Sequence, residues 1–176
     1  MGVMMIIKVK DLDINYIQYG EGSDVILLHG WGQNIQMMEP LGKKLANKFK
    51  VTILDLPGHG SSQEPKDALT IYDYCEILKE ILNKLKIDNP IIIGHSFGGR
   101  IGIIYAANYD TEKLILLGAP CIRKVEKLSL KTRTLKQLKK IPILNKFEEF
   151  AKKHIGSRDY RNASPGKSKI VTLNLL

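Results

Sequence analysis

Four short, continuously apolar runs set the strongest limit on how this chain can fold. They lie at residues 25–28, 51–54, 91–93 and 114–117. A strand that is apolar at every position is buried on both faces, which is typical of a parallel sheet with helices on each side. The stretches between these runs are long enough for helices, so the sequence predicts alternating strands and helices.

Helical patterns fill these stretches. Apolar residues recur at helical spacing near residues 38–45, 71–85 and 98–108. Pro40 is expected in the first turn of its helix, where proline is tolerated. Thr70 and Asp73 form a capping-box pattern ahead of the next helix.

The N-terminal segment predicts a hairpin. Residues 4–9 and 14–19 are rich in β-forming side chains and flank a turn at 11–13. The expected fold class is therefore α/β, with a mostly parallel sheet, an N-terminal antiparallel hairpin and helices on both faces.

A serine flanked by glycines follows the third apolar run. In Gly94-His95-Ser96-Phe97-Gly98, Ser96 lies between a predicted strand and a predicted helix. A sharp strand-to-helix turn pushes the serine oxygen out of the sheet, and Gly94 and Gly98 leave room for close backbone approach. The first amides of the following helix point to where negative charge develops during nucleophilic attack. Ser96 is the candidate nucleophile, and an accidental glycine-rich turn is the alternative.

Four segments together resemble the α/β-hydrolase superfamily, in its small esterase-like branch with a helical cap. They are His29-Gly30-Trp31-Gly32, the Asp-Leu-Pro-Gly-His-Gly-Ser-Ser run at 55–62, the serine turn at 94–99 and Leu117-Gly118-Ala119-Pro120. The resemblance covers residues 1 to about 155. It implies that the backbone N–H groups of Trp31 and Phe97 form an oxyanion hole. Serine at position 96, where other branches have aspartate, argues against dehalogenases and epoxide hydrolases.

The residues that would activate Ser96 are not found. A serine hydroxyl needs a neighbouring base, and the family supplies a late aspartate and then a late histidine. The four histidines are His29, His59, His95 and His154. The first two are expected to be structural, the third to point away from Ser96, and the last to be solvated. Asp55 matches a turn residue of the family. We therefore expect a truncated or frameshifted chain that lacks the triad acid and base and the last two strands.

Charge divides the chain near Pro120. Residues 1–120 carry 12 Lys and Arg against 14 Asp and Glu, whereas residues 121–176 carry 15 against 4. We expect a core at 1–120, a helical cap segment at 121–163 and an atypical tail at 164–176. The basic amphipathic stretch of the helical cap segment has an alternative role at membranes or acidic partners.

The sequence thus predicts a serine hydrolase for ester, thioester or similar acyl bonds of a small-molecule substrate, impaired in this chain. The alternatives are a non-catalytic remnant or binding module, and a transferase or lyase on the same scaffold. Neither a cofactor, a metal nor a nucleic-acid partner is expected, because the motifs that bind them are absent from the sequence.

Two further features bear on location. No apolar run is long enough to form an integral membrane segment. The two cysteines, Cys75 and Cys121, indicate buried thiols in a reducing compartment. A cytoplasmic location is expected, and the sequence leaves the oligomeric state open.

Overall fold

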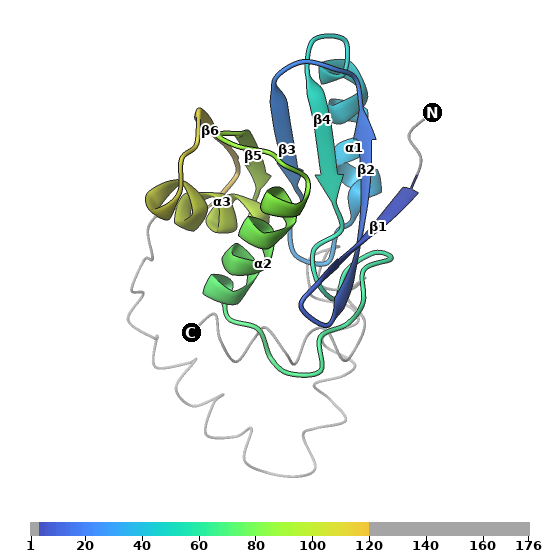
Figure 1. Cartoon of the computed structure of the whole chain (residues 1–176), viewed down its shortest axis with the longest axis vertical. Helices are drawn as coiled ribbons and strands as arrows, with labels where there is room; N and C mark the ends of the chain where they lie inside the picture. The colour runs from blue at the N-terminus through green and yellow to red at the C-terminus, as the bar shows by residue number, and fades with distance from the viewer. Residues whose placement is uncertain (1–3, 120–176) are drawn as a thin grey trace, which may run out of the picture. The chain divides into compact units, whose positions relative to one another are not determined.

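The computed structural model describes residues 4–119, which form a six-stranded sheet with helices packed on it (Figure 1). The strands are β1 (Met4–Val9), β2 (Leu12–Tyr19), β3 (Asp24–Leu28), β4 (Lys50–Leu54), β5 (Ile91–His95) and β6 (Lys113–Leu117). Their order across the sheet is β1-β2-β4-β3-β5-β6. Strand β2 runs antiparallel to β1 and β4, and the other neighbours pair in parallel. The predicted α/β fold class and antiparallel hairpin are confirmed.

Helices cover both faces of the sheet. They are α1 (Ile35–Leu45), α2 (Ile71–Lys84) and α3 (Phe97–Asn108). In β3, Val25 and Leu27 pack in the cluster that includes α1, whereas Ile26 and Leu28 pack in the cluster under α2 and α3. Successive strand side chains point to opposite faces, so one continuously apolar strand contributes to both clusters. This is the reason that the apolar runs predict the layered arrangement correctly.

The hairpin turn differs from the prediction. It consists of Lys10 and Asp11, because Val9 pairs directly with Leu12. Lys10 has a φ of 53°, in the left-handed region that tight hairpin turns use. Leu12 is 9% exposed and packs in the main core cluster. Leu12 is therefore the first residue of β2 and not part of the turn, so the turn predicted at 11–13 is wrong.

Pro40 also lies elsewhere than expected. Helix α1 begins at Ile35, so Pro40 is inside the helix and not in its first turn. Two side chains start the helix early: the Asn34 side chain accepts a hydrogen bond from the Gln36 N–H at 3.1 Å, and Asp55 Oδ1 accepts from the Ile35 N–H at 2.8 Å. These contacts satisfy N–H groups that a helix start leaves without partners.

Strand β6 lies at the edge of the described sheet and is less buried than the other three apolar runs. Its side chains alternate between exposed and half-buried, with Ile115 43% and Leu117 38% exposed. In contrast, every residue from Val51 to Leu54 of β4 is buried. A continuously apolar run therefore does not distinguish a central strand from an edge strand.

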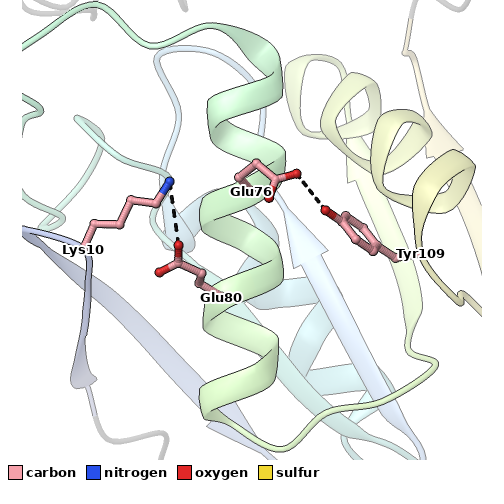
Figure 2. Close-up of polar contacts among 4 residues, drawn as sticks. All are labelled: Lys10, Glu76, Glu80 and Tyr109. Atoms are coloured by element: carbon pink, nitrogen blue, oxygen red, sulfur yellow. Dashed lines mark hydrogen bonds and ion pairs between the residues drawn. The ribbon is translucent and has the colours of Figure 1, made fainter.

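Two surface contacts join α2 to its neighbours (Figure 2). Glu76 accepts a hydrogen bond of 2.7 Å from the hydroxyl of Tyr109, which follows α3. Glu80 forms an ion pair of 3.7 Å with Lys10 of the hairpin turn. Exposed pairs of this kind contribute at most about 1 kcal/mol each, so they orient α2 without determining the fold.

Several sequence predictions fall outside the described residues. These are the helical cap segment at 121–163, the tail at 164–176, Cys121 and His154. Within residues 4–119, no helix has the length and apolar character needed to cross a membrane. The cytoplasmic location stays a prediction.

The capping box of α2 provides a test of this local structure. The Asp73 N–H donates to Thr70 Oγ1 at 3.2 Å, and the Asp73 carboxylate accepts from the Thr70 hydroxyl and N–H at 2.6 and 2.7 Å. These bonds to Thr70 hold the pKa of Asp73 below its usual value. We expect Thr70→Ala to lower the free energy of unfolding by about 1 kcal/mol at neutral pH, because the cap is lost.

The sign of the pH dependence follows from the lowered pKa. The stabilisation by the Asp73 carboxylate is complete above the pKa that this carboxyl has in the unfolded chain. It is lost as the pH falls through the lower pKa of Asp73 in the folded state. The difference between Thr70→Ala and the unaltered chain should therefore narrow in acid, as measured by urea unfolding at several pH values. A difference that stays constant into acid would contradict the carboxylate contribution.

Candidate active site

Ser96 occupies a strained turn between β5 and α3. Its backbone has φ 48° and ψ −106°, a combination rarely adopted by residues with a side chain. The Ser96 N–H donates to the Leu117 carbonyl at 3.0 Å, and the Ser96 carbonyl accepts from the Arg100 N–H at 3.2 Å. Both backbone groups of the serine are thus fixed, one by strand β6 and one by the first turn of α3.

The glycines around Ser96 permit close backbone packing. A Cβ added at Gly94 would lie 2.5 Å from the Gly99 Cα, and one at Gly98 would lie 2.6 Å from the His29 carbonyl oxygen. The obstacles are backbone atoms, which cannot move aside as a flexible side chain can. The Gly98 N–H donates to the same His29 carbonyl at 3.1 Å. Close approach therefore connects the serine turn directly to the end of β3.

The residues that follow β3 form a turn beside Ser96, which we call turn 30–33. It is closed by a 3.2 Å hydrogen bond from the Gln33 N–H to the Gly30 carbonyl. The Trp31 ring contacts the Phe97 ring edge-on, with ring centres 5.6 Å apart. Tyr74 of α2 contacts the other side of this cluster, 5.1 Å from Phe97. The two predicted oxyanion donors are therefore brought together.

The backbone N–H groups of Trp31 and Phe97 differ from neighbouring N–H groups in their hydrogen bonding. The Phe97 N–H is the first of α3, and the first N–H groups of a helix have no partner within it. The next one, on Gly98, is taken by the His29 carbonyl. Within residues 4–119, the N–H groups of Trp31 and Phe97 have no acceptor among the hydrogen bonds found. Each of these N–H groups can donate a hydrogen bond to an acceptor atom of a ligand.

The three histidines of the described part all interact with groups other than Ser96. His29 is fully buried; its Nε2 accepts from the Leu56 N–H at 3.0 Å, so its Nδ1 carries the proton and donates to the Gly30 carbonyl at 2.7 Å. His59 is also buried and bonds the Pro57 carbonyl through Nδ1 at 2.9 Å. His95 bonds the side chain of Gln33 at 3.0 Å. Within residues 4–119, none of these histidines forms a hydrogen bond with the Ser96 side chain.

Asp55 is the centre of a buried polar network that the sequence did not reveal. Its carboxylate is 3% exposed and accepts three hydrogen bonds of 2.8 Å. The donors are Asn15 Nδ2 of β2, the Ile35 N–H that begins α1 and the Ser61 N–H. The Ser62 hydroxyl adds a 2.6 Å bond to the Asp55 carbonyl. Asp55 therefore holds the turn after β4 against its neighbours, in agreement with the structural role expected for it.

Burial raises the pKa of two neighbouring side chains of α2, Tyr74 and Cys75. Burial raises the pKa of Tyr74, whose hydroxyl donates to the Pro57 carbonyl at 3.3 Å. Burial, with a smaller effect of neighbouring Glu76, raises the pKa of the Cys75 thiol to about 11. Cys75 is therefore a protonated, buried thiol at neutral pH and does not compete with Ser96 as a nucleophile.

A cavity among the described residues lies away from Ser96. It has a volume of about 580 Å³ and is lined by residues that include Lys79, Asp88, Tyr105 and Asp110. Residues 105–110 of this lining end or follow α3. Ser96 immediately precedes that helix, which has 12 residues and is roughly 18 Å long. No group of three His, Cys, Asp or Glu side chains within residues 4–119 could hold a metal ion. The candidate site is therefore defined by the serine turn and turn 30–33.

A serine in a strained turn at the carboxyl edge of a parallel sheet defines the class of protein, and comparison with known proteins identifies its family. The sequence profile for the alpha/beta hydrolase fold matches residues 25–140, more than half of the chain. The chain belongs to the alpha/beta hydrolase fold family.

Individual relatives show how much of such a protein this chain represents. It is 37% identical over 107 residues to the AB hydrolase superfamily protein YisY of Bacillus subtilis, covering 57% of this chain and 39% of that protein. It is 37% identical over 102 residues to the pimeloyl-(acyl-carrier protein) methyl ester esterase of Pseudoalteromonas atlantica, covering 56% and 38%. The chain thus matches less than two fifths of the length of these relatives.

A solved structure is similar over the same region. The enol-lactonase of Burkholderia xenovorans LB400 superimposes with a TM-score of 0.57 and 28% sequence identity. The match covers 59% of this chain and 42% of the lactonase.

The Asp55 network leads to a prediction about stability. Asp55→Ala leaves three donors without their acceptor, and the two that are buried, Asn15 Nδ2 and the Ile35 N–H, each cost about 1–3 kcal/mol. We expect the free energy of unfolding to fall by about 3 kcal/mol or more, measured by urea denaturation. Asp67→Ala is the matched control, because Asp67 is exposed, and it should change stability by less than about 0.5 kcal/mol. Equal effects of the two substitutions would contradict the network.

The strain at Ser96 leads to a second prediction. Ser96→Gly should increase the free energy of unfolding by about 1 kcal/mol, because glycine adopts positive φ without the strain that a side chain incurs. Ser96→Ala keeps a Cβ and should leave stability close to that of the unaltered chain. Thermal unfolding followed by circular dichroism compares the three proteins. A glycine variant no more stable than the alanine variant would show that the turn is not strained.

Proposed function

We propose that this chain carries the nucleophilic half of an α/β-fold serine hydrolase that acts on ester, thioester or similar acyl bonds. The observation that carries the proposal is the conformation of Ser96, held at φ 48° between β5 and α3. Strain of this kind is concentrated at functional sites. The position of Ser96 immediately before α3, in a turn bonded to the residues that follow β3, supports a role in acyl transfer.

The reaction follows from this arrangement. Ser96 Oγ gives its proton to a base and attacks the acyl carbon, and the carbonyl oxygen becomes an oxyanion. The N–H groups of Trp31 and Phe97 are proposed to donate hydrogen bonds to that oxyanion. The bond to the leaving group then breaks as the leaving atom takes up a proton. Water cleaves the resulting Ser96 ester, which releases the acid and restores the hydroxyl.

The names of two relatives support the acyl substrate class. The Pseudoalteromonas relative is named as a methyl ester esterase and the Burkholderia structure as an enol-lactonase. Esters and lactones share a carbonyl carbon bonded to an oxygen leaving group, the group that a serine nucleophile attacks. We propose a small-molecule acyl substrate on this ground, in a cytoplasmic protein without a nucleic-acid partner.

Activation of Ser96 depends on residues outside 4–119. The histidines His29, His59 and His95 bond other groups, and the family's late acid and base have no match in the sequence. Loss of general-base activation costs on the order of 10⁶ in rate, with residual catalysis from the oxyanion hole. We therefore expect the 176-residue chain to turn over an activated ester far more slowly than an ordinary esterase.

Covalent labelling tests the proposal. A fluorophosphonate probe forms a P–O bond to an activated serine and releases fluoride. We expect slow, stoichiometric labelling of the chain at Ser96, identified by peptide mass spectrometry, and no labelling of Ser96→Ala. Ser62→Ala is unsuitable as a control because the Ser62 side chain bonds Asp55. Ser61 is exposed and bonds Asp55 only through its backbone N–H, which alanine keeps, so Ser61→Ala should be labelled like the unaltered chain.

The same experiment evaluates the non-catalytic alternative. The interactions of all three described histidines with groups other than Ser96 favour that alternative. A folded chain that no fluorophosphonate labels would overturn the proposal and leave a remnant or binding module. Turnover of an activated ester at ordinary enzyme rates, lost in Ser96→Ala, would instead overturn the expected impairment.

A further inference from the structure

The side-chain oxygen of Gln33 is shared by two elements of the candidate site. Gln33 Oε1 accepts the Gly30 N–H at 2.9 Å, within turn 30–33. The same atom lies 3.0 Å from Nδ1 of His95, the last residue of β5. Positions 33 and 95 are 62 residues apart in the sequence. One atom therefore joins the turn that carries Trp31 to the residue that immediately precedes Ser96.

The chemistry of the donors fixes the direction of both bonds. A backbone N–H only donates, so the Gln33 atom that faces Gly30 is the amide oxygen and not the nitrogen. Because an amide oxygen only accepts, His95 Nδ1 carries a proton and donates it to Gln33. The imidazole ring of His95 is thereby held toward turn 30–33.

Close packing leaves little room for another arrangement. A Cβ added at Gly30 would lie 2.8 Å from His95 Nδ1 and 2.9 Å from Gln33 Oε1. The turn, the amide and the imidazole are therefore in mutual contact. A displacement of about 1 Å in a catalytic site is enough to reduce a rate about 100-fold, so a contact of this kind can determine reactivity.

We propose that Gln33 is a positioning residue, whose Oε1 fixes the Trp31 N–H relative to Ser96 by binding Gly30 and His95 together. This inference rests on the proposed function, in which the Trp31 N–H stabilises the oxyanion. Gln33 does not touch the reacting atoms. It acts through the turn, and its hydrogen-bond acceptor is the essential feature.

The first test measures the rate of fluorophosphonate labelling at Ser96 in three variants of the full chain. Gln33→Met keeps the length of the side chain and removes the acceptor, whereas Gln33→Glu keeps an oxygen that accepts from both donors. Gln36→Met is the matched control, because Gln36 is exposed in the adjacent first turn of α1.

We expect Gln33→Met to slow labelling roughly tenfold or more, since a misplaced oxyanion donor loses much of its effect. Gln33→Glu and Gln36→Met should react within about threefold of the unaltered chain, a range far smaller than the loss of a donor. If glutamate keeps the labelling rate near that of the unaltered chain while methionine does not, the role of Gln33 is to accept hydrogen bonds and not merely to fill space. Labelling of Gln33→Met at the unaltered rate, or failure of both the Met and Glu variants in folded protein, would overturn the proposal.

The second test does not depend on reactivity. Hydrogen exchange of the Gly30 amide reports its bond to Gln33 Oε1, and Trp31 is the only tryptophan in the chain, so its fluorescence quenching by acrylamide reports the turn. In Gln33→Met the Gly30 amide should exchange roughly tenfold faster and Trp31 should be quenched more readily. If Gln33→Met fails to fold, Gln33→Asn takes its place in this test. It withdraws the side-chain oxygen by one methylene and should cause the same faster exchange and stronger quenching.

These readouts separate the two proposals. If the unaltered chain is not labelled, the proposed function fails, and amide exchange and quenching decide the role of Gln33 alone. Faster exchange in Gln33→Met with recovery in Gln33→Glu would then support its hold on turn 30–33. Unchanged exchange and quenching would overturn that role whatever the reactivity of Ser96.

Discussion

The conformation of Ser96 depends on carbonyl groups from the strands on either side of β5. The Leu117 carbonyl at the end of β6 binds the Ser96 N–H, and the His29 carbonyl after β3 binds the Gly98 N–H. These two bonds enclose the sharp turn from both sides, which is how a residue with a Cβ is kept at φ 48°. A strained backbone persists only when its surroundings determine it more strongly than its own preference does. The parallel pairing of β3, β5 and β6 supplies those surroundings, because it brings the carboxyl ends of all three strands to one edge of the sheet.

The same edge is reinforced by buried polar groups. Asp55 after β4 binds β2, the start of α1 and the Ser61 N–H, while His29 after β3 binds the Leu56 N–H. A buried carboxylate is tolerated because it has three donors, and each donor would otherwise lack a partner. The turns that follow β3, β4 and β5 are thus bonded to one another, and the residues around Ser96 form a rigid surface.

Local patterns predicted most of the fold, and non-local contacts account for what they missed. The four apolar runs located β3 to β6, and the β-forming residues at 4–9 and 14–19 located β1 and β2, because these patterns act within a single strand. The exposure of Ile115 does not follow from its apolar run, because an edge position depends on neighbouring strands. Pro40 was misplaced because α1 is begun partly by Asp55, 20 residues from Ile35. The strand–serine–helix pattern indicated Ser96, but nothing near Gln33 in the sequence indicates its bond to His95.

Placement and activation of the proposed nucleophile, Ser96, are separable physical problems. Placement is solved by the backbone of β3, β5, β6 and α3, with glycines where side chains would collide. Activation needs a proton acceptor, and His29, His59 and His95 instead support the turns around the serine. If these histidines moved to reach Ser96, the bonds that hold the turns would break, so structural support and general-base catalysis compete for the same side chains. In the proposed function the base comes from residues outside 4–119, so labelling by a fluorophosphonate and turnover of an ester both depend on the placement and on the activation of Ser96.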